Sequence, residues 1–492
     1  MTGTNFQSPP RRDPQDGPKP PRNLVFILSD EHNRDVLGCY GHPFVQTPNL
    51  DALAGSGVRF DAACCNSPIC VPSRASLATG RHVHALGNWD NAFPYTGAPR
   101  SWHHVLRDAG VDVASIGKLH FRGGDDYGFT EELIPLHVLN GKGDLKGLFR
   151  RDPLPKKGTR ALSEQAGPGR SSYSDYDARI AQTASDWLAR RAENAEAPGF
   201  ALFVSFVMPH FPLIAPEDCY ALYEDHDLDT LQHGLTAPVD PHPALDHMRR
   251  ISDYDAHFTP ATRARALRAY YGMVTRLDQL IGEVLRSLEE TGLSETTSVI
   301  YSSDHGDNLG SHGLWGKSVM YESAVAVPLI LRDPRLDPGS AVDVPVSLAD
   351  IAPTAADICG VEEHDPDWSG TSLVEIARTP PRDRSVFAEY HATSSNTGMF
   401  MVRQGQWKYI CYPGFEPQLF DLATDPQERR NLAGDAACRE ILQRLDAELR
   451  TYCDPEEVNT RAFADQAAMI EANGGRETIA ASADIPFTPA PS

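Results

Sequence analysis

The stretch "NLVFILSDE" (Asn23–Glu31) places a run of apolar residues directly before two acids. Such a short apolar run, rich in branched side chains, is typical of a strand that is buried on both faces of a sheet. Similar runs recur along the chain: "VDVASI" from Val111, "FALFVSFV" from Phe200, "TSVIYS" from Thr297 and "VPLIL" from Val327. We therefore predict a sheet whose strands come from distant parts of the sequence.

Helical patterns separate these predicted strands. Thr47-Pro48 has the form of an N-cap followed by proline at the first helical position. Residues 261–290 repeat apolar side chains at steps of three and four, which predicts one long amphipathic helix. Alternation of strands and helices predicts the α/β class, with a large, mostly parallel sheet sandwiched by helices.

Composition and charge restrict the class of protein. The hydrophobic content of 41% is ordinary for a globular chain, and no run of about 18 apolar residues predicts a membrane span. Nine cysteines without paired spacing are expected to be free thiols. A net charge of −22 without a basic stripe argues against a nucleic-acid partner. An anionic substrate would require a local positive cluster to overcome that charge.

The two ends of the chain differ from its middle. Residues 1–22 are polar and proline-rich without an apolar h-region, so we expect a disordered leader and a cytoplasmic protein. After the large domain (23–385), "MFMVRQGQWKYICYP" predicts a hairpin around Gln404-Gly405. The following "PQLFDLATDPQERRNLA" predicts a strand running into a helix. Residues 386–453 are therefore expected to form a smaller α+β subdomain.

The last residues, 454–492, are polar, alanine-rich and poor in core residues. Such a tail gains order by docking elsewhere, so we expect an arm that covers the domain or a neighbouring subunit. This arm suggests a homo-oligomer, either a dimer or a tetramer.

Ionisable residues follow four of the predicted strands. Ligands of open α/β sheets bind outside the carboxyl ends of the strands, where the loops converge. We therefore expect these side chains to meet at one edge of the sheet. They are Asp30 and Glu31, Lys118 and His120, His210, and Asp304 and His305.

Asp30, Glu31 and Asp304 supply three carboxylates and His305 supplies one imidazole, a set that suits a single divalent cation. Oxygen ligands favour Ca²⁺ or Mg²⁺, whereas the imidazole of His305 shifts the preference toward Mn²⁺. Acids after strands also commonly cap the next helix, and that alternative stays open for either pair alone. Two adjacent pairs, Asp30-Glu31 and Asp304-His305, favour the metal interpretation.

The segment "CVPSRASLATGR" (Cys70–Arg81) predicts a helix that begins at Cys70 and ends at Gly80. The helix N-terminus favours an anion, and Arg74, one turn along, can bind two oxygens of a tetrahedral oxyanion. A free cysteine is more commonly a small buried hydrophobe, which is the alternative. A thiolate phosphatase loop is excluded, because its arginine lies six residues after the cysteine, where this chain has Ser76.

The motif resembles the signature of the type I sulfatases, which belong to the alkaline phosphatase superfamily. The resemblance extends from Asn23 to about Asn431 and includes "TPNLDALAGSGVRF", "IGKLHF", "VMPHFP" and "SSDHGDNLGSHGLWGK". Within the family, "CNSPICVPSRASLATG", "WDNA" and "GKLHF" most resemble the choline-sulfatase-like and phosphonate-hydrolase-like bacterial branch. The resemblance implies an alkaline phosphatase-like fold, with 23–385 as the catalytic domain.

The same resemblance implies the chemistry. A formylglycine-generating enzyme would convert Cys70 to Cα-formylglycine, whose hydrated aldehyde attacks the sulfur and later expels sulfate. One metal ion, Ca²⁺ first and Mn²⁺ as alternative, would be held by Asp30, Glu31, Asp304, His305 and the oxygen of modified Cys70. The roles implied for the remaining residues are stabilisation of the diol and metal site by Arg74 and Lys118, base catalysis by His120, and sulfate binding with protonation of the leaving oxygen by His210 and Lys317.

Two positions depart from the pattern of many sulfatases, which have Asp in place of Glu31 and Asn in place of His305. His305 matches the branch that includes phosphonate and phosphodiester hydrolases. The expected function is hydrolysis of a small organic sulfate monoester, of aryl or alkyl (choline) type. Phosphonate monoester or phosphodiester hydrolysis is the alternative, and a non-catalytic binding protein with unmodified Cys70 is the third.

Substrate contacts are expected near these motifs. Besides His210 and Lys317, the candidates are Trp89, Asn91 and Trp315. An aromatic box would suit a quaternary ammonium group such as choline, although aromatic residues near motifs also serve as packing.

Overall fold

The computed structural model describes residues 23–154, 158–194, 198–228, 242–362, 365–483 and 487–491. The leader expected at 1–22 lies outside these residues. Within the described ranges, no helix is both long and apolar enough to cross a membrane.

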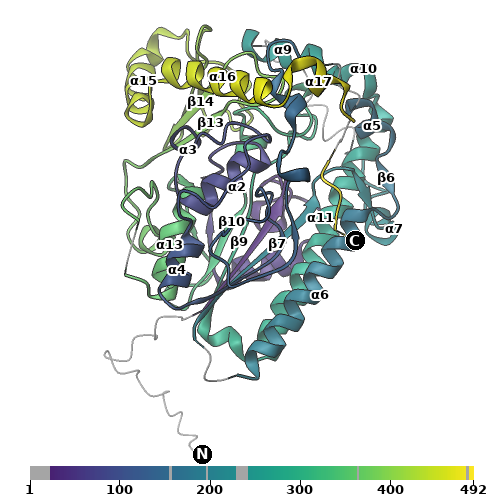
Figure 1. Cartoon of the computed structure of the whole chain (residues 1–492), viewed down its shortest axis with the longest axis vertical. Coiled ribbons are helices and arrows are strands. Elements are labelled where there is room, and N and C mark those ends of the chain that lie inside the picture. Colours follow the sequence, from purple (N-terminus) through teal and green to yellow (C-terminus); the bar gives the residue numbers. More distant parts are fainter. Residues whose placement is uncertain are drawn as a thin grey trace, which may run out of the picture.

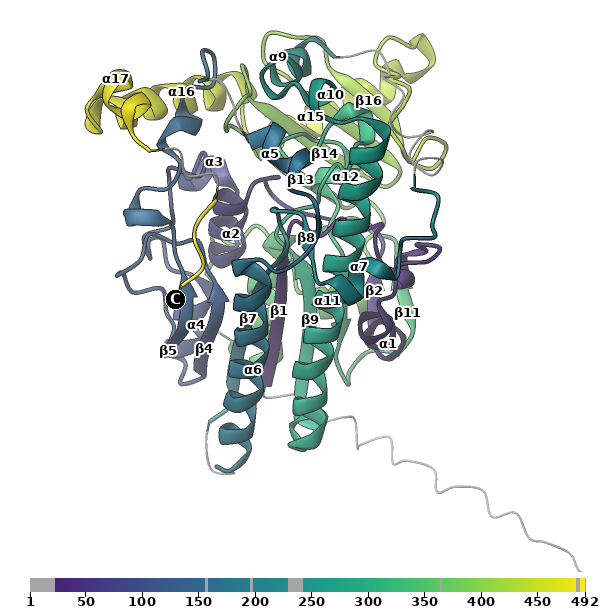
Figure 2. The ribbon, with the colours of Figure 1, turned by 90° about the vertical axis from the view of Figure 1, so that its right-hand side faces the viewer.

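An eight-stranded sheet forms the centre of the molecule (Figures 1 and 2). Its order is β11 (Ser340–Val342), β2 (Val58–Phe60), β10 (Leu329–Arg332), β9 (Thr297–Ser303), β1 (Asn23–Asp30), β7 (Phe200–Pro209), β4 (Asp112–Lys118) and β5 (Glu131–Leu136). β10, the predicted strand from Val327, is antiparallel to β9 and β2, and the other pairs are parallel. The mostly parallel sheet predicted from the sequence is therefore confirmed.

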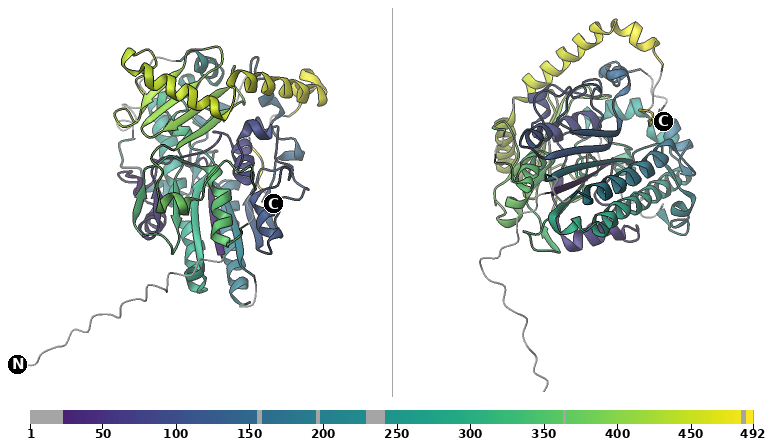
Figure 3. Two further views of the ribbon diagram at one scale, coloured as in Figure 1. Left: turned by 90° about the vertical axis from the view of Figure 1, so that its left-hand side faces the viewer. Right: turned by 60° about the horizontal axis from the view of Figure 1, so that its bottom comes forward.

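Helices cover both faces of this sheet, as Figure 3 shows. All eight residues of β1 are buried, and alternate side chains join different cores. Val25 and Ile27 pack with α1 (Pro48–Ser56), α6 (Ser172–Ala192) and α11 (Pro260–Glu290). Leu24 and Phe26 pack on the other face, in a core that includes α2 (Cys70–Thr79), α4 (Trp102–Asp108) and α13 (Ile351–Cys359). Burial on both faces explains why the predicted strands are continuous apolar runs.

The helix predicted at Cys70 begins and ends where the sequence indicates. α2 ends at Gly80, whose φ is 65°. This left-handed conformation suits glycine, and a Cβ there would lie 2.8 Å from the Cβ of Ala352. The helix therefore packs closely on α13.

A separate antiparallel sheet follows the main one, in the order β13 (Ser385–Tyr390), β14 (Met399–Gln404), β15 (Trp407–Cys411) and β16 (Gln418–Asp421). Gln404 pairs with Trp407, so the predicted hairpin turns at Gly405-Gln406. The helix predicted directly after β16 is wrong. Asp421 instead accepts hydrogen bonds from Ala423 and Thr424 in a turn, and the next α-helix, α15 (Arg439–Tyr452), begins later.

The C-terminal segment contains α16 (Pro455–Ala472) and α17 (Gly475–Ala481), which run along the top of the molecule in Figure 1. It packs on this same chain. The Trp89 indole donates to Asp465 at 2.8 Å, and the Gln466 amide donates to Asp90 at 2.7 Å.

The remaining elements are short. The helices are α3 (Val83–Leu86), α5 (Gly158–Glu164), α7 (Glu217–Ala221), α9 (Pro243–Ser252), α10 (Tyr254–His257), α12 (Glu322–Val325) and α14 (Leu373–Arg378). Two further parallel pairs join β12 (Val346–Ser347) to β3 (Ala63–Cys64) and β6 (Gly167–Pro168) to β8 (Ile214–Ala215).

Candidate active site

The register of the two central strands brings the predicted acids together. Ser29 of β1 lies opposite Ser303 of β9, so the residues that follow, Asp30 and Asp304, leave the sheet side by side. The backbone N–H of Asp304 donates to the carbonyl of Ser29 at 3.2 Å. The N–H of Glu31 donates to the Asp304 carboxylate at 3.2 Å. Parallel pairing alone therefore places three carboxylates at one edge of the sheet.

Cys70, at the start of α2, points into this acidic group. Its Sγ lies 3.3 Å from Nε2 of His305 and 3.6 Å from Oδ1 of Asp30. One ligand atom from each of Asp30, Cys70, Asp304 and His305 lies within 4.8 Å of the others, and all four residues are buried. Asp30, Glu31 and His210 form a second such group. This donor set fits one divalent cation shared between the two groups.

His305 is oriented to offer a lone pair to a cation. Its Nδ1 lies 3.0 Å from the carbonyl of Gly306, which can only accept, so the hydrogen bond assigns the proton to Nδ1. Nε2, the nitrogen facing Cys70, is then unprotonated. A metal-binding histidine commonly has this arrangement.

Three cationic side chains surround the acids. Arg74 lies between two of them, with Nε 2.7 Å from Asp304 and Nη2 3.1 Å from Asp30. Lys118 contacts Asp30 from the end of β4. Nζ of Lys317 lies 3.0 Å from Oε2 of Glu31 and 3.2 Å from Sγ of Cys70. The local positive cluster that an anionic substrate requires is therefore present in a chain of net charge −22.

The pKa values of Asp30 and Glu31 are shifted in opposite directions. Burial would raise the pKa of Asp30, but Lys118 and the neighbouring cations hold it well below its usual range. Burial raises the pKa of Glu31 to about 8, against the opposing effect of Lys317. Its Oε1 is buried without a hydrogen-bond partner among the described residues. A buried carboxylate oxygen without a partner is unfavourable unless a cation binds it, which supports a metal site here.

Cys70 is a poor nucleophile in its unmodified form. Burial, together with the charge of Asp30, raises the pKa of its thiol to about 12. The thiol is therefore neutral near pH 7 before any ion binds, whereas the reactive form of a cysteine is the thiolate.

Two histidines complete the group. His210 follows β7; its Nδ1 lies 2.7 Å from the carbonyl of Phe211, and its Nε2 faces Glu31 at 3.5 Å. His120 follows β4 with a φ of 56°, and Glu31 has a φ of 68°. Such left-handed backbone is uncommon for residues other than glycine, and strained examples cluster at functional sites.

The three other residues expected in the substrate pocket, Asn91, Trp89 and Trp315, lie in different places. Asn91 lies at the start of α2, where its Oδ1 accepts from the N–H of Val71 at 3.2 Å. Trp89 packs with the C-terminal sheet and contacts Arg461 and Asp465. Trp315 stacks on Phe258 with ring centroids 4.2 Å apart. Asn91 thus lies near Cys70, and Trp89 lies with the C-terminal elements. Trp315 lies two residues before Lys317, with its ring packed on Phe258.

Several residues at the site were not singled out from the sequence. The Ser73 hydroxyl, within the cysteine motif, donates to the carbonyl of Asp304 at 2.6 Å. The Ser205 hydroxyl accepts from Arg74 at 2.9 Å. Thr488 contacts His120 from the far end of the chain. Ser73 could have been found from its place in the motif, but Ser205 and Thr488 carry no local signal.

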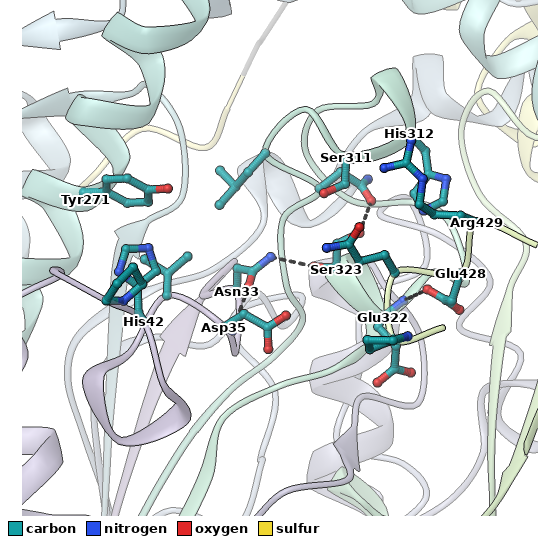
Figure 4. Close-up of a pocket in the computed structure, with 16 residues that line it drawn as sticks. Asn33, Asp35, His42, Tyr271, Ser311, His312, Glu322, Ser323, Glu428 and Arg429 are labelled. Atoms are coloured by element: carbon teal, nitrogen blue, oxygen red, sulfur yellow. Dashed lines mark hydrogen bonds between the residues drawn. The ribbon is translucent and has the colours of Figure 1, made fainter. Parts of the chain in front are cut away.

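A cavity of about 270 Å³ lies beside the loop that follows β9 (Figure 4). It is lined by Asn33, His42, Tyr271, Glu322 and Glu428, among others, and by none of the predicted site residues. The residues that could perform chemistry are therefore buried at the sheet edge and not in this cavity.

The chain is similar to known sulfatases over most of its length. The sulfatase family model matches residues 22–361, and the model for the C-terminal part of N-sulphoglucosamine sulphohydrolase matches residues 310–454. Choline-sulfatase of Rhizobium meliloti (strain 1021) is 32% identical over 427 residues, which covers 84% of this chain and 82% of the relative. Arylsulfatase K of Danio rerio is 31% identical over 453 residues, covering 88% and 84%.

A solved structure shows the same fold. Phosphonate monoester hydrolase of Agrobacterium radiobacter superposes with a TM-score of 0.70 at 24% identity, covering 88% of this chain and 95% of that one. From the family match and these relatives, the chain belongs to the sulfatase family of sulfuric ester hydrolases, with an alkaline phosphatase-like fold.

Proposed function

We propose that the protein hydrolyses a small organic sulfate monoester, of aryl or alkyl (choline) type, through formylglycine at Cys70 and one divalent metal ion. The observation that carries the proposal is the position of Cys70. Its Sγ lies between the acids and Lys317, 3.2 Å from the lysine Nζ, where an oxygen nucleophile would contact both metal and substrate. The similarity to choline-sulfatase and arylsulfatase K supports sulfate monoesters as the substrate class.

Asp30, Glu31, Asp304 and His305 would hold the metal, together with the oxygen of modified Cys70. When bound, the metal would lower the pKa of the formylglycine hydrate and neutralise charge on the sulfate. The oxygen-rich donor set favours Ca²⁺, with Mn²⁺ as the alternative because His305 supplies one imidazole.

The other residues act on the ester. Lys317 and His210 face the same side of Glu31, and we assign them the binding of sulfate oxygens and the proton for the leaving alcohol. Arg74 and Lys118 hold the buried carboxylates in place through Asp30. His120 serves as the base that restores the resting site. Asn91, beside the start of α2, stays a candidate for substrate contact, as do Trp89 and Trp315.

Three partner and location predictions complete the proposal. Modification of Cys70 requires a formylglycine-generating enzyme as a transient partner. A homo-oligomer and a cytoplasmic location stay predictions, to be measured by sedimentation and by fractionation of the native host.

The test compares kcat/KM for 4-nitrophenyl sulfate, choline sulfate and a phenyl phosphonate monoester, each with added Ca²⁺ or Mn²⁺. The mass of the peptide containing Cys70 shows whether the aldehyde is present, and Cys70→Ala is the control. We expect a sulfate to be preferred by orders of magnitude and the control to be inactive.

Two results would change the conclusion. Preference for the phosphonate would indicate a phosphonate monoester hydrolase, an activity that the imidazole of His305 also allows. An unmodified Cys70 peptide from the native host, with no turnover of any ester, would indicate a binding protein.

A further inference from the structure

The last described residues, 487–491, return to the main domain and lie against the candidate active site. In Figures 1 and 2 this yellow segment, marked C, lies below α17 against the body of the molecule. Oγ1 of Thr488 lies 3.2 Å from Nε2 of His120. This contact joins residues 368 positions apart in the sequence.

Contacts with α6 fix this segment. The Tyr173 hydroxyl donates to the carbonyl of Thr488 at 2.6 Å, and Arg179 donates to the carbonyl of Pro491 at 3.0 Å. The ring of Phe487 packs on Tyr173, with centroids 5.2 Å apart. Two backbone carbonyls and one ring of residues 487–491 are therefore held against α6.

The same helix, α6, also contacts the second histidine of the site. The ring of Tyr173 lies 6.1 Å from that of His210, edge to face. Residues 487–491 thus lie against His120 directly and against His210 through Tyr173. Only 7% of His120 and 6% of His210 is exposed.

The His120 ring depends on Thr488 for its orientation. Among the described residues, the Thr488 hydroxyl is its one hydrogen-bond partner, and its Nδ1 is buried without any. A hydroxyl can donate to Nε2 or accept from it, so the bond can persist whether or not that nitrogen carries a proton. Without it, a buried ring on a left-handed backbone would lack a polar contact that selects one rotamer.

We propose that residues 487–491 form a wall of the active site, in which Thr488 is a positioning residue for His120 and the wall limits the substrate to small sulfate esters. The inference rests on the proposed function, because it assigns a substrate size to that same site. The inference adds to that function because residues 487–491 lie, in the sequence, far from every sulfatase motif of the chain.

The first experiment separates positioning from packing. Thr488→Val keeps the shape but removes the hydroxyl, and Thr488→Ser restores it. We expect Thr488→Val to lower kcat for 4-nitrophenyl sulfate by about 10- to 100-fold with little change in KM, and Thr488→Ser to recover most of the loss. Thr478→Val is the matched control, since the Thr478 hydroxyl bonds locally, to the carbonyl of Gly474 at the start of α17. Equal kcat in Thr488→Val and wild type would overturn the positioning role.

The second experiment tests the wall. A chain ending at Ala483 removes the segment but keeps α16 and α17. We expect kcat/KM for a sulfated disaccharide, relative to that for 4-nitrophenyl sulfate, to rise by about 10-fold or more. An unchanged ratio would overturn the size limit, and a rise in turnover of the small ester would show that the segment is an obstruction.

A third readout does not depend on sulfatase activity. The rate at which diethyl pyrocarbonate modifies His120 is measured by mass spectrometry, with His42 as internal reference. We expect a protected His120 in the full chain and a reactive one in the chain ending at Ala483. Equal rates would show that the segment does not cover the site. If the full chain cleaves no sulfate, the proposed function fails, and this rate still decides whether the wall exists.

Discussion

At the residue scale, Arg74 shows how one side chain organises the site. Its guanidinium bonds to Asp30, Asp304, the Ser205 hydroxyl and the carbonyl of Lys118. A planar guanidinium with five donors can satisfy several buried acceptors at fixed angles, which a lysine cannot. Arg74 therefore connects β1, β4, β7 and the loop after β9 through one group.

The role of Lys317 can be tested through turnover, because its side chain faces Cys70 and not the sheet. We expect Lys317→Met to lower kcat/KM for the preferred sulfate by about 100- to 1,000-fold, since a preorganised positive charge next to the reacting group is lost. Lys142→Met, on the surface, is the control and should match wild type. A loss below about 3-fold would remove Lys317 from the assigned role.

Metal binding by Glu31 can be measured without turnover. Ca²⁺ at about 100 times its Kd should stabilise the wild type by about 2.7 kcal/mol, seen as a rise in Tm. We expect Glu31→Gln to lose most of that rise, because one charged ligand is removed. Glu283→Gln, on the outer part of α11, should keep it. An equal rise in Glu31→Gln and wild type would show that Glu31 is not a ligand.

At the element scale, the start of α1 illustrates a correct boundary with an unexpected cap. The helix begins at Pro48 after Thr47, as predicted, but the Thr47 side chain makes no capping bond. The free N–H groups of Asn49 and Leu50 instead donate to Asp278 of α11, at 3.2 and 2.8 Å. A carboxylate from another helix thus does what an N-cap residue usually does.

This cap predicts a stability effect. Asp278→Ala should reduce the free energy of unfolding by about 1–3 kcal/mol, because the N–H groups of Asn49 and Leu50 lose their acceptor. Denaturant unfolding measures the change, and Glu289→Ala, at an exposed position of α11, should be close to neutral. If both variants unfold alike, α1 does not depend on Asp278.

The same carboxyl group predicts a pH dependence. Burial raises the pKa of Asp278 to about 6, although the hydrogen bonds from α1 oppose the rise. The folded state therefore keeps this proton to a higher pH than the unfolded state, whose carboxyl has an ordinary pKa. The part of its contribution that depends on this proton is full below about pH 4 and is lost as the pH rises through about 6. The difference in unfolding free energy between wild type and Asp278→Ala should thus shrink from about pH 4 to about pH 6.5, and a growing difference would contradict this sign.

At the scale of the whole molecule, the C-terminal helices connect the two sheets. Gln466 of α16 is buried, accepts from Arg150 at 3.0 Å and donates to Asp90 and to the carbonyl of His391. Because His391 directly follows β13, α16 ties the small sheet to loops of the large domain.

Removing these helices should therefore destabilise the whole chain. A chain ending at Cys453 loses the Gln466 bonds to Asp90 and Arg150 and the core packing of Val458 and Ala462, and we expect its Tm to fall by several degrees. A chain ending at Ala483 keeps the Gln466 contacts and should lose less. Calorimetry distinguishes the two, and an unchanged Tm in the shorter chain would mean that α16 adds no net stability.

The sequence by itself determined the class of fold, the strand ends that carry Asp30 and Asp304, and the helix of Cys70. These features depend on local patterns: apolar runs, turn residues and a motif of fixed spacing. The helix expected after β16 failed because a side-chain turn at Asp421 competed with it. Only the tertiary structure decided which residues meet, namely Asp278 at α1, Thr488 at His120 and Trp89 at Asp465. Each of these contacts joins residues more than two hundred positions apart, and the pattern of either segment alone does not specify its partner.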